Sequence, residues 1–142
     1  MQAQNFKNHA KMVPGFHYIA LPAILVFLIA SVNYLIQSSA ENKYLGALLC
    51  LLSLILILMA WYFRSFSLKA QDRAIRAEEN FRHFIATGKA LPKELSMGQI
   101  IALRFASEEE FVALAAKANA ENLSNKEIKL LIKNWKADHD RA

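Results

Sequence analysis

An uncharged apolar run over residues 44–63 constrains this chain more than any other feature. It reads YLGALLCLLSLILILMAWYF and is twenty residues long. A helix of that length reaches roughly 30 Å, which matches the hydrocarbon thickness of a bilayer. A lone apolar segment must satisfy its backbone N–H and C=O groups internally, so a helix is the expected spanning form. We therefore predict a transmembrane helix over this run.

The end of this run carries the residues expected at a membrane interface. Trp61 and Tyr62 are rings with a polar edge, and Arg64 follows them as the first cation. Such residues lie where lipid headgroups meet water. Four cations and one acid lie between residues 64 and 76, which predicts contact with anionic headgroups. The predicted lipid-interface set is Trp61, Tyr62, Arg64, Lys69, Arg73 and Arg76.

A second apolar segment, over residues 19–36, precedes this run. We predict a first span over about 15–36, kinked at Pro22 because proline removes a backbone hydrogen bond. The link over residues 37–43 is so short that 13–63 should form an antiparallel hairpin. A cleaved signal peptide is the alternative, but an apolar core of about 18 residues exceeds the usual 7–15 of such peptides.

The distribution of Lys and Arg sets the expected orientation. Two precede the first span, one lies in the link, and five lie between residues 64 and 82. Because cations favour the cytoplasmic side, both termini should be cytoplasmic, with 1–12 as a polar tail and the link in the periplasm. The net charge of +5 fits this basic side. It does not indicate nucleic-acid binding, since no cluster of Arg and Lys is interleaved with stacking aromatics.

Residues 64–88 are predicted to continue the second span as a stalk helix. No Pro or Gly interrupts this stretch before Gly88, which stands where a C-terminal cap would. Five apolar side chains suit packing against a small neighbouring bundle: Leu68, Ile75, Phe81, Phe84 and Ile85.

Residues 89–142 are predicted to form a small cytoplasmic domain of about three short helices. Segments 95–100 and 123–128 both read L-S-x-x-[QE]-I, and 107–111 reads SEEEF. In a capping box the Ser hydroxyl accepts a bond from the N3 amide, and the N3 Gln or Glu reaches back to the cap. The 79 residues from Arg64 to Ala142 are few for independent stability, so this part should depend on the membrane, another copy of the chain or a partner. The three starts place helices near 97–106, 108–121 and 125–138.

Two groups of polar residues are candidates for interaction. Asn33 lies within the first span, where a buried amide should find a hydrogen-bond partner, either Ser53 in the second span or a residue of another chain. The alternative is that Asn33, near the outer end of the span, reaches the interface. Four lysines follow helical spacing beside Trp135 on the last predicted helix: Lys126, Lys129, Lys133 and Lys136. They would form a basic stripe that docks on anionic lipid or on an acidic partner. The alternative is an ordinary solvated face.

No pattern in the sequence predicts catalysis, a cofactor or a metal site. None of the four histidines, His9, His17, His83 and His139, has a ligand partner at helical spacing. His17 is the best of them, as a haem ligand or a group that titrates near neutral pH, or as an interfacial residue bonded to headgroups or backbone. The only cysteine, Cys50, excludes an intramolecular disulfide. We expect no enzyme and identify no small-molecule substrate.

Three segments resemble a small bacterial family of two-span membrane proteins of unknown function: QNFKNHAKMVPGFHYIALP, LSMGQIIALRFASEEEF and IKLLIKNWKAD. The resemblance covers nearly the whole chain and implies a bacterial inner-membrane protein, with no established activity or cofactor. We predict an all-α membrane protein with a two-helix hairpin, a stalk and a helical domain. The expected function is a non-enzymatic accessory or scaffold subunit that binds another membrane protein or itself. The alternative is a homo-oligomeric small channel or transporter component.

Overall fold

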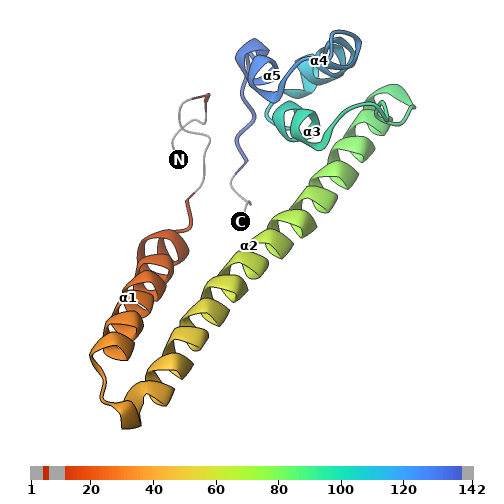
Figure 1. Ribbon diagram of the computed structural model, residues 1–142. Coiled ribbons are helices and arrows are strands. Elements are labelled where there is room, and N and C mark those ends of the chain that lie inside the picture. The colour runs from red at the N-terminus through yellow and green to blue at the C-terminus, as the bar shows by residue number, and fades with distance from the viewer. Residues whose placement is uncertain (1–4, 7–11, 139–142) are drawn as a thin grey trace. The chain divides into compact units, whose positions relative to one another are not determined.

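The computed structural model describes residues 5–6 and 12–138, and these residues are helical apart from loops and one isolated β-bridge (Figure 1). The helices are η1 (Gly15–Ala20), α1 (Leu21–Gln37), η2 (Ala40–Asn42), α2 (Lys43–Thr87), α3 (Met97–Leu103), α4 (Glu108–Ala120) and α5 (Asn125–Leu131). The predicted all-α class is confirmed. Most of the predicted tail over 1–12 lies outside the described residues.

Two stretches of helix are long and apolar enough to cross a membrane, Gly15–Gln37 and Ala40–Thr87. The described residues divide into two compact units. The first is Met12–Ser67, and the second comprises the described residues from Leu68 onward together with residues 5–6. The long helix α2 contributes residues to both units.

In the first unit, α1 and α2 meet near the link that joins them. The Ser53 hydroxyl donates to the Ser31 hydroxyl at 3.4 Å, and both side chains are buried. A Cβ placed on Gly46 would lie 2.9 Å from the Leu35 Cα, so only glycine fits this approach. The expected Asn33–Ser53 pair is wrong. Asn33 is exposed and accepts a hydrogen bond from Gln37 of its own helix at 2.6 Å, because Ser31 is the residue that faces α2.

The first of the two apolar stretches begins with a π-helical turn, η1, directly before α1. The Leu21 amide donates to the carbonyl of Phe16, five residues earlier. Pro22 then occupies the first turn of α1, where its missing N–H costs little. The irregularity expected at Pro22 is therefore located in the wider turn that precedes it.

In the second unit, the ends of the helices largely follow the sequence signals. Gly88 has a φ of 71° and its amide donates to Phe84 O at 2.8 Å, which confirms the predicted cap of α2. Complete capping boxes confirm the predicted starts of α3, at Ser96 and Gln99, and of α5, at Ser124 and Glu127. The Gln99 side-chain amide also donates to Leu123 O at 2.8 Å, so the first box holds the loop before the second.

The predicted helix over 125–138 is wrong beyond residue 131. The chain is extended from Ile132 and returns to the loop before α4. There Ala106 and Trp135 form an antiparallel bridge, the Lys136 amide donates to Phe105 O at 2.8 Å, and the Ser107 amide donates to Asn134 O at 3.1 Å. These backbone bonds replace those that a longer helix would have made.

The predicted box at the start of α4 is also wrong, for a related reason. Ser107 occupies the cap position, but its buried hydroxyl has no partner among the described residues. The N3 residue, Glu110, instead accepts hydrogen bonds from the amides of Lys133 and Asn134 at 3.2 and 3.0 Å. The carboxylate that should complete the box therefore holds the segment after α5.

The core of the second unit is built from α3, α4 and α5 against one residue of α2, Ile75. Its fully buried large side chains are Leu103, Phe105, Phe111 and Ile128. Of the stalk residues expected to pack on a bundle, only Ile75 is buried. Phe81, Phe84 and Ile85 are 64%, 53% and 69% exposed, so that expectation is wrong for them. We call these three residues the apolar patch.

Candidate functional site

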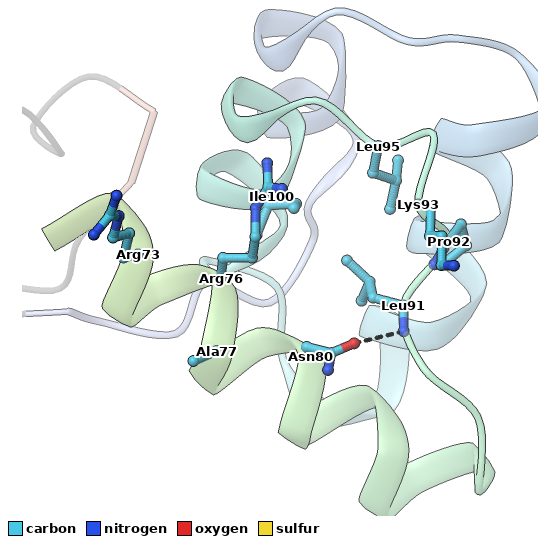
Figure 2. Close-up of a pocket in the computed structure, with 9 residues that line it drawn as sticks. All are labelled: Arg73, Arg76, Ala77, Asn80, Leu91, Pro92, Lys93, Leu95 and Ile100. Atoms are coloured by element: carbon cyan, nitrogen blue, oxygen red, sulfur yellow. Dashed lines mark hydrogen bonds between the residues drawn. The ribbon is translucent and has the colours of Figure 1, made fainter. Parts of the chain in front are cut away.

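A groove of about 370 Å³ lies between α2, the loop that follows it and the start of α3 (Figure 2). Three cations lie along it, Arg73 and Arg76 on α2 and Lys93 on the loop, and we call it the basic groove. Its remaining lining residues are Ala77, Asn80, Leu91, Pro92, Leu95 and Ile100. Most of these are apolar, so the groove combines a positive rim with an apolar floor.

The cap of α2 and one side-chain bond give the groove its shape. Gly88 turns the chain, and Asn80 Oδ1 then accepts a hydrogen bond from the Leu91 amide at 2.9 Å, drawn in Figure 2. Leu91 and Leu95 are buried on either side of Lys93. The loop is thus fixed along α2, and its exposed lysine lines the same groove as the two arginines.

The cations of the basic groove form no ion pair within the described residues. Within the described part of the chain, Arg73, Arg76 and Lys93 have no ion-pair partner, whereas Arg82 on the same helix has two. Unpaired cations beside apolar surface favour a negatively charged ligand.

The apolar patch continues one face of α2 beyond the groove. Ala77 lines the groove, and Phe81 and Phe84 follow it by four and seven residues, the spacing of one helix face. Exposed apolar side chains grouped in this way mark surfaces that contact other molecules.

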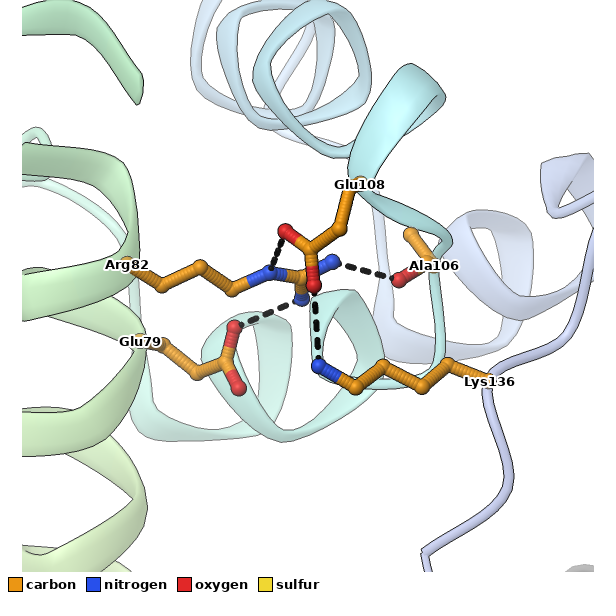
Figure 3. Close-up of polar contacts among 5 residues, drawn as sticks. All are labelled: Glu79, Arg82, Ala106, Glu108 and Lys136. Carbon is orange, nitrogen blue, oxygen red and sulfur yellow. Dashed lines mark hydrogen bonds and ion pairs between the residues drawn. The ribbon is translucent and has the colours of Figure 1, made fainter. Parts of the chain in front are cut away.

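A polar cluster around Arg82 fixes α2 to the helical domain (Figure 3). Its guanidinium donates to Glu79 at 3.0 Å, to Glu108 at 2.7 Å and to Ala106 O at 2.8 Å. It also lies 4.0 Å from the ring centre of Phe111. Lys136 completes the cluster by donating to Glu108 at 2.9 Å. Arg82 and Glu79 are only 11% and 7% exposed in their side chains, so they form a nearly buried ion pair.

The pKa values of the two carboxylates in this cluster are shifted in opposite directions. Burial raises the pKa of Glu79 above its ordinary 4.5, even though Arg82 opposes the shift. Hydrogen bonds from Arg82 and Lys136 lower the pKa of Glu108 below the same value. A single guanidinium therefore contacts two different carboxylates. Burial disfavours the charged form of Glu79, and hydrogen bonds favour the charged form of Glu108.

The family model described as "Family of unknown function (DUF6526)" matches residues 1–142. The chain belongs to the DUF6526 family. This confirms the resemblance to an uncharacterised family. The chain matches no curated protein and no solved structure. The function of this DUF6526 chain therefore has to be argued from its surfaces.

The structure does not place the four predicted lysines of this DUF6526 chain on one helix. Lys126 and Lys129 lie on α5, but Lys133 and Lys136 lie in the extended segment after it. Lys129 lies 5.7 Å from the ring centre of Phe105, and Lys136 is paired with Glu108. The expected stripe is therefore divided, and part of it serves the domain itself.

Trp135 and the described histidines have structural contacts in this DUF6526 chain. The Trp135 ring packs 5.2 Å from that of Phe105, between ring centres. His83 is buried, with Nδ1 2.9 Å from Lys89 O. The Nδ1 atom of His17 lies 2.9 Å from Val13 O. His9 and His139 lie outside the described residues.

Proposed function

We propose that this protein is a non-enzymatic membrane scaffold that holds an acidic partner protein. In this proposal Gly15–Gln37 and the first part of α2 form a hairpin in the bacterial inner membrane, and both termini lie in the cytoplasm. The remainder of α2 is the stalk of the cytoplasmic domain. The observation that carries the docking role is the basic groove, where three cations without ion-pair partners in the described chain border an apolar floor.

The exposure of the apolar helices supports the membrane location. Only 6% of the apolar window of Gly15–Gln37 is buried within the protein, and 17% of that of Ala40–Thr87. The core helix of a soluble domain would be mostly buried. Side chains such as Leu25, Ile29 and Leu58 are instead exposed, which suits contact with lipid.

The surface of the second unit supports a protein partner. Interfaces combine apolar anchors with a polar rim, and complementary charges guide the encounter. The apolar patch offers Phe81, Phe84 and Ile85, and the basic groove offers three cations. A partner helix with acidic and apolar side chains would match both.

We expect reporter fusions to place residue 142 in the cytoplasm and residue 39 in the periplasm. The excess of Lys and Arg outside the link is the physical reason. Alkaline phosphatase is active only in the periplasm and green fluorescent protein folds efficiently only in the cytoplasm, so the two reporters give opposite signals. Reversed signals at both sites would overturn the orientation.

We expect the double variant Arg73→Glu/Lys93→Glu to lose at least about tenfold in recovery of the partner protein, because it places like charges against an acidic surface. The full-length variants would be expressed at equal levels, crosslinked in cells and purified in mild detergent. Quantitative mass spectrometry would then compare the proteins recovered with each.

The comparison variant is Lys126→Glu/Lys133→Glu, which makes the same change of charge on two lysines of the predicted basic stripe, away from the basic groove, and so separates the two candidate docking surfaces. Partners recovered equally with the wild type and both double variants would contradict docking at the groove. An equal loss in both variants would indicate a general charge effect. Recovery of a symmetric homo-oligomer without another protein would favour the alternative, a small channel or transporter component.

A further inference from the structure

A second groove, of about 390 Å³, lies within the first unit and is almost entirely apolar. Phe16, Leu21 and Ile24 line it from the η1 and α1 side. Ile57, Ala60 and Trp61 line it from α2. We call it the lateral groove.

The lateral groove exists because the two helices approach closely at one end only. Near the link, small residues allow contact, as at Gly46 and at the Ser31–Ser53 pair. At the other end the π-helical turn η1 and larger side chains replace them. The side chains at that end line a space between the two helices but do not fill it.

A cation and a histidine complete the lining of this groove, Arg64 and His17. Over residues 12–67 the charged residues are Glu41, Lys43 and Arg64, and the single acid lies in η2 near the link. No carboxylate of this unit therefore competes for Arg64. Trp61 and the neighbouring aromatic rings mark this end as the level of the lipid headgroups.

We propose that the lateral groove binds an anionic glycerophospholipid, with one acyl chain between α1 and α2 and the phosphate against Arg64 and His17. This inference rests on the membrane location proposed above. The groove is open to the surrounding lipid, and its apolar walls match an acyl chain. Charge complementarity selects an anionic headgroup over a zwitterionic one.

The two polar side chains suit a phosphate for different reasons. The guanidinium of Arg64 can donate two parallel hydrogen bonds to phosphate oxygens. The Nδ1 atom of His17 is engaged by the main chain of Val13, with Val13 N at 3.2 Å and Val13 O at 2.9 Å. In the tautomer in which Nδ1 accepts from the Val13 amide, the ring proton lies on Nε2, which can donate to a phosphate oxygen.

Trp61 lines the groove and can report its occupant by fluorescence. The full chain, in a Trp135→Phe background, would be reconstituted in phosphatidylcholine vesicles. Brominated phosphatidylglycerol or brominated phosphatidylcholine would then be added at matched mole fractions. We expect phosphatidylglycerol to quench Trp61 with about fivefold higher relative affinity, the effect of one cation at the membrane surface. Arg64→Gln should abolish this preference, and Arg64→Lys should keep part of it.

Two control variants separate the groove from general surface effects. Lys43→Gln removes a cation near the link and should leave the preference intact. Ala60→Leu fills the groove and should weaken quenching by phosphatidylglycerol. Ala47→Leu adds the same volume at an exposed position of α2 and should leave that quenching unchanged.

Equal quenching by both lipids in the wild type would overturn the lipid site while leaving the membrane location standing. An unchanged preference in Arg64→Gln would overturn it as well. An Ala60→Leu variant that dimerises differently but binds lipid as before would assign the groove to a second copy of the chain. Absence of quenching by either lipid would overturn the membrane location and this inference together.

Discussion

Replacing Arg82 with Met is expected to lower the free energy of unfolding of the second unit by about 3–5 kcal/mol. Methionine keeps the unbranched stem of the arginine side chain. It lacks the guanidinium that donates hydrogen bonds to Glu79, Glu108 and Ala106 O. Glu79 is then left nearly buried with no cation in contact. An unpaired charge in that position costs far more than the pair contributes when intact. Hydrogen exchange of the α3 and α4 amides in the detergent-solubilised full chain measures the loss.

The pH dependence of this loss has a definite sign. Without Arg82, only the charges of Lys136 and Arg104 still oppose the effect of burial, so the folded-state pKa of Glu79 rises further above 4.5. A raised pKa in the folded state favours folding below the unfolded value and loses that contribution as pH rises through the folded value. The variant should therefore be least impaired below about pH 4.5 and most impaired at neutral pH. A pH-independent loss would contradict the assignment to Glu79.

Two further variants test the cluster itself. Arg82→Lys keeps the charge and should retain part of the stability. The double variant Glu79→Leu/Arg82→Met removes both members of the buried pair and should recover most of what Arg82→Met loses, because no carboxylate then remains buried alone. A double variant as unstable as Arg82→Met would show that the loss comes from packing around Phe111.

Replacing Phe105 with Ala is expected to cost about 3–5 kcal/mol of the same unit's stability. Phe105 is fully buried, and its ring packs against Trp135 of the segment after α5. Its carbonyl oxygen also accepts a hydrogen bond from the Lys136 amide. The cavity left by the ring therefore opens where the extended segment joins the core. Hydrogen exchange should show the loss first in the amides of residues 132–138.

Phe105→Leu is the matched control, because it keeps an apolar side chain of intermediate size and should lose less. Leu131→Ala removes an apolar side chain that is already exposed and should stay within about 0.5 kcal/mol of the wild type. Equal losses in Phe105→Ala and Leu131→Ala would contradict the position of the core.

The features that sequence predicted well depend on neighbouring residues. Gly88 caps α2, and the boxes at Ser96 and Ser124 start α3 and α5, because the groups that must bond are three or four positions apart. The apolar runs likewise define two long helices from their own composition. Such signals need no knowledge of the rest of the chain.

Several of the failures involve contacts between residues that lie far apart along the chain. Ser107 has the local sequence of a capping box, yet Glu110 bonds the amides of Lys133 and Asn134, more than twenty positions away. The same contact explains why α5 ends early although its apolar spacing continues to Trp135. Asn33 was expected to face α2, but the crossing of the two helices selects Ser31.

Only part of the basic groove could be predicted from the sequence. Arg73 and Arg76 stand out as cations after an apolar run, and we predicted them as headgroup contacts. Lys93 had no comparable signal, because its place beside them depends on Asn80 holding the loop at Leu91. The lateral groove was equally hidden, since it depends on where two helices separate.

The second unit can complete its contacts only after the segment that follows α5 has been synthesised. Residues 133–136 supply the amides that Glu110 and Phe105 accept, and Lys136 is the second cation on Glu108. A ribosome makes these residues after every helix of the unit. The two long apolar helices thus emerge first, and if they lie in the membrane as proposed, they enter the bilayer while α3, α4 and α5 are still incomplete. In the proposed topology, anchoring in the membrane therefore precedes closure of the domain during synthesis.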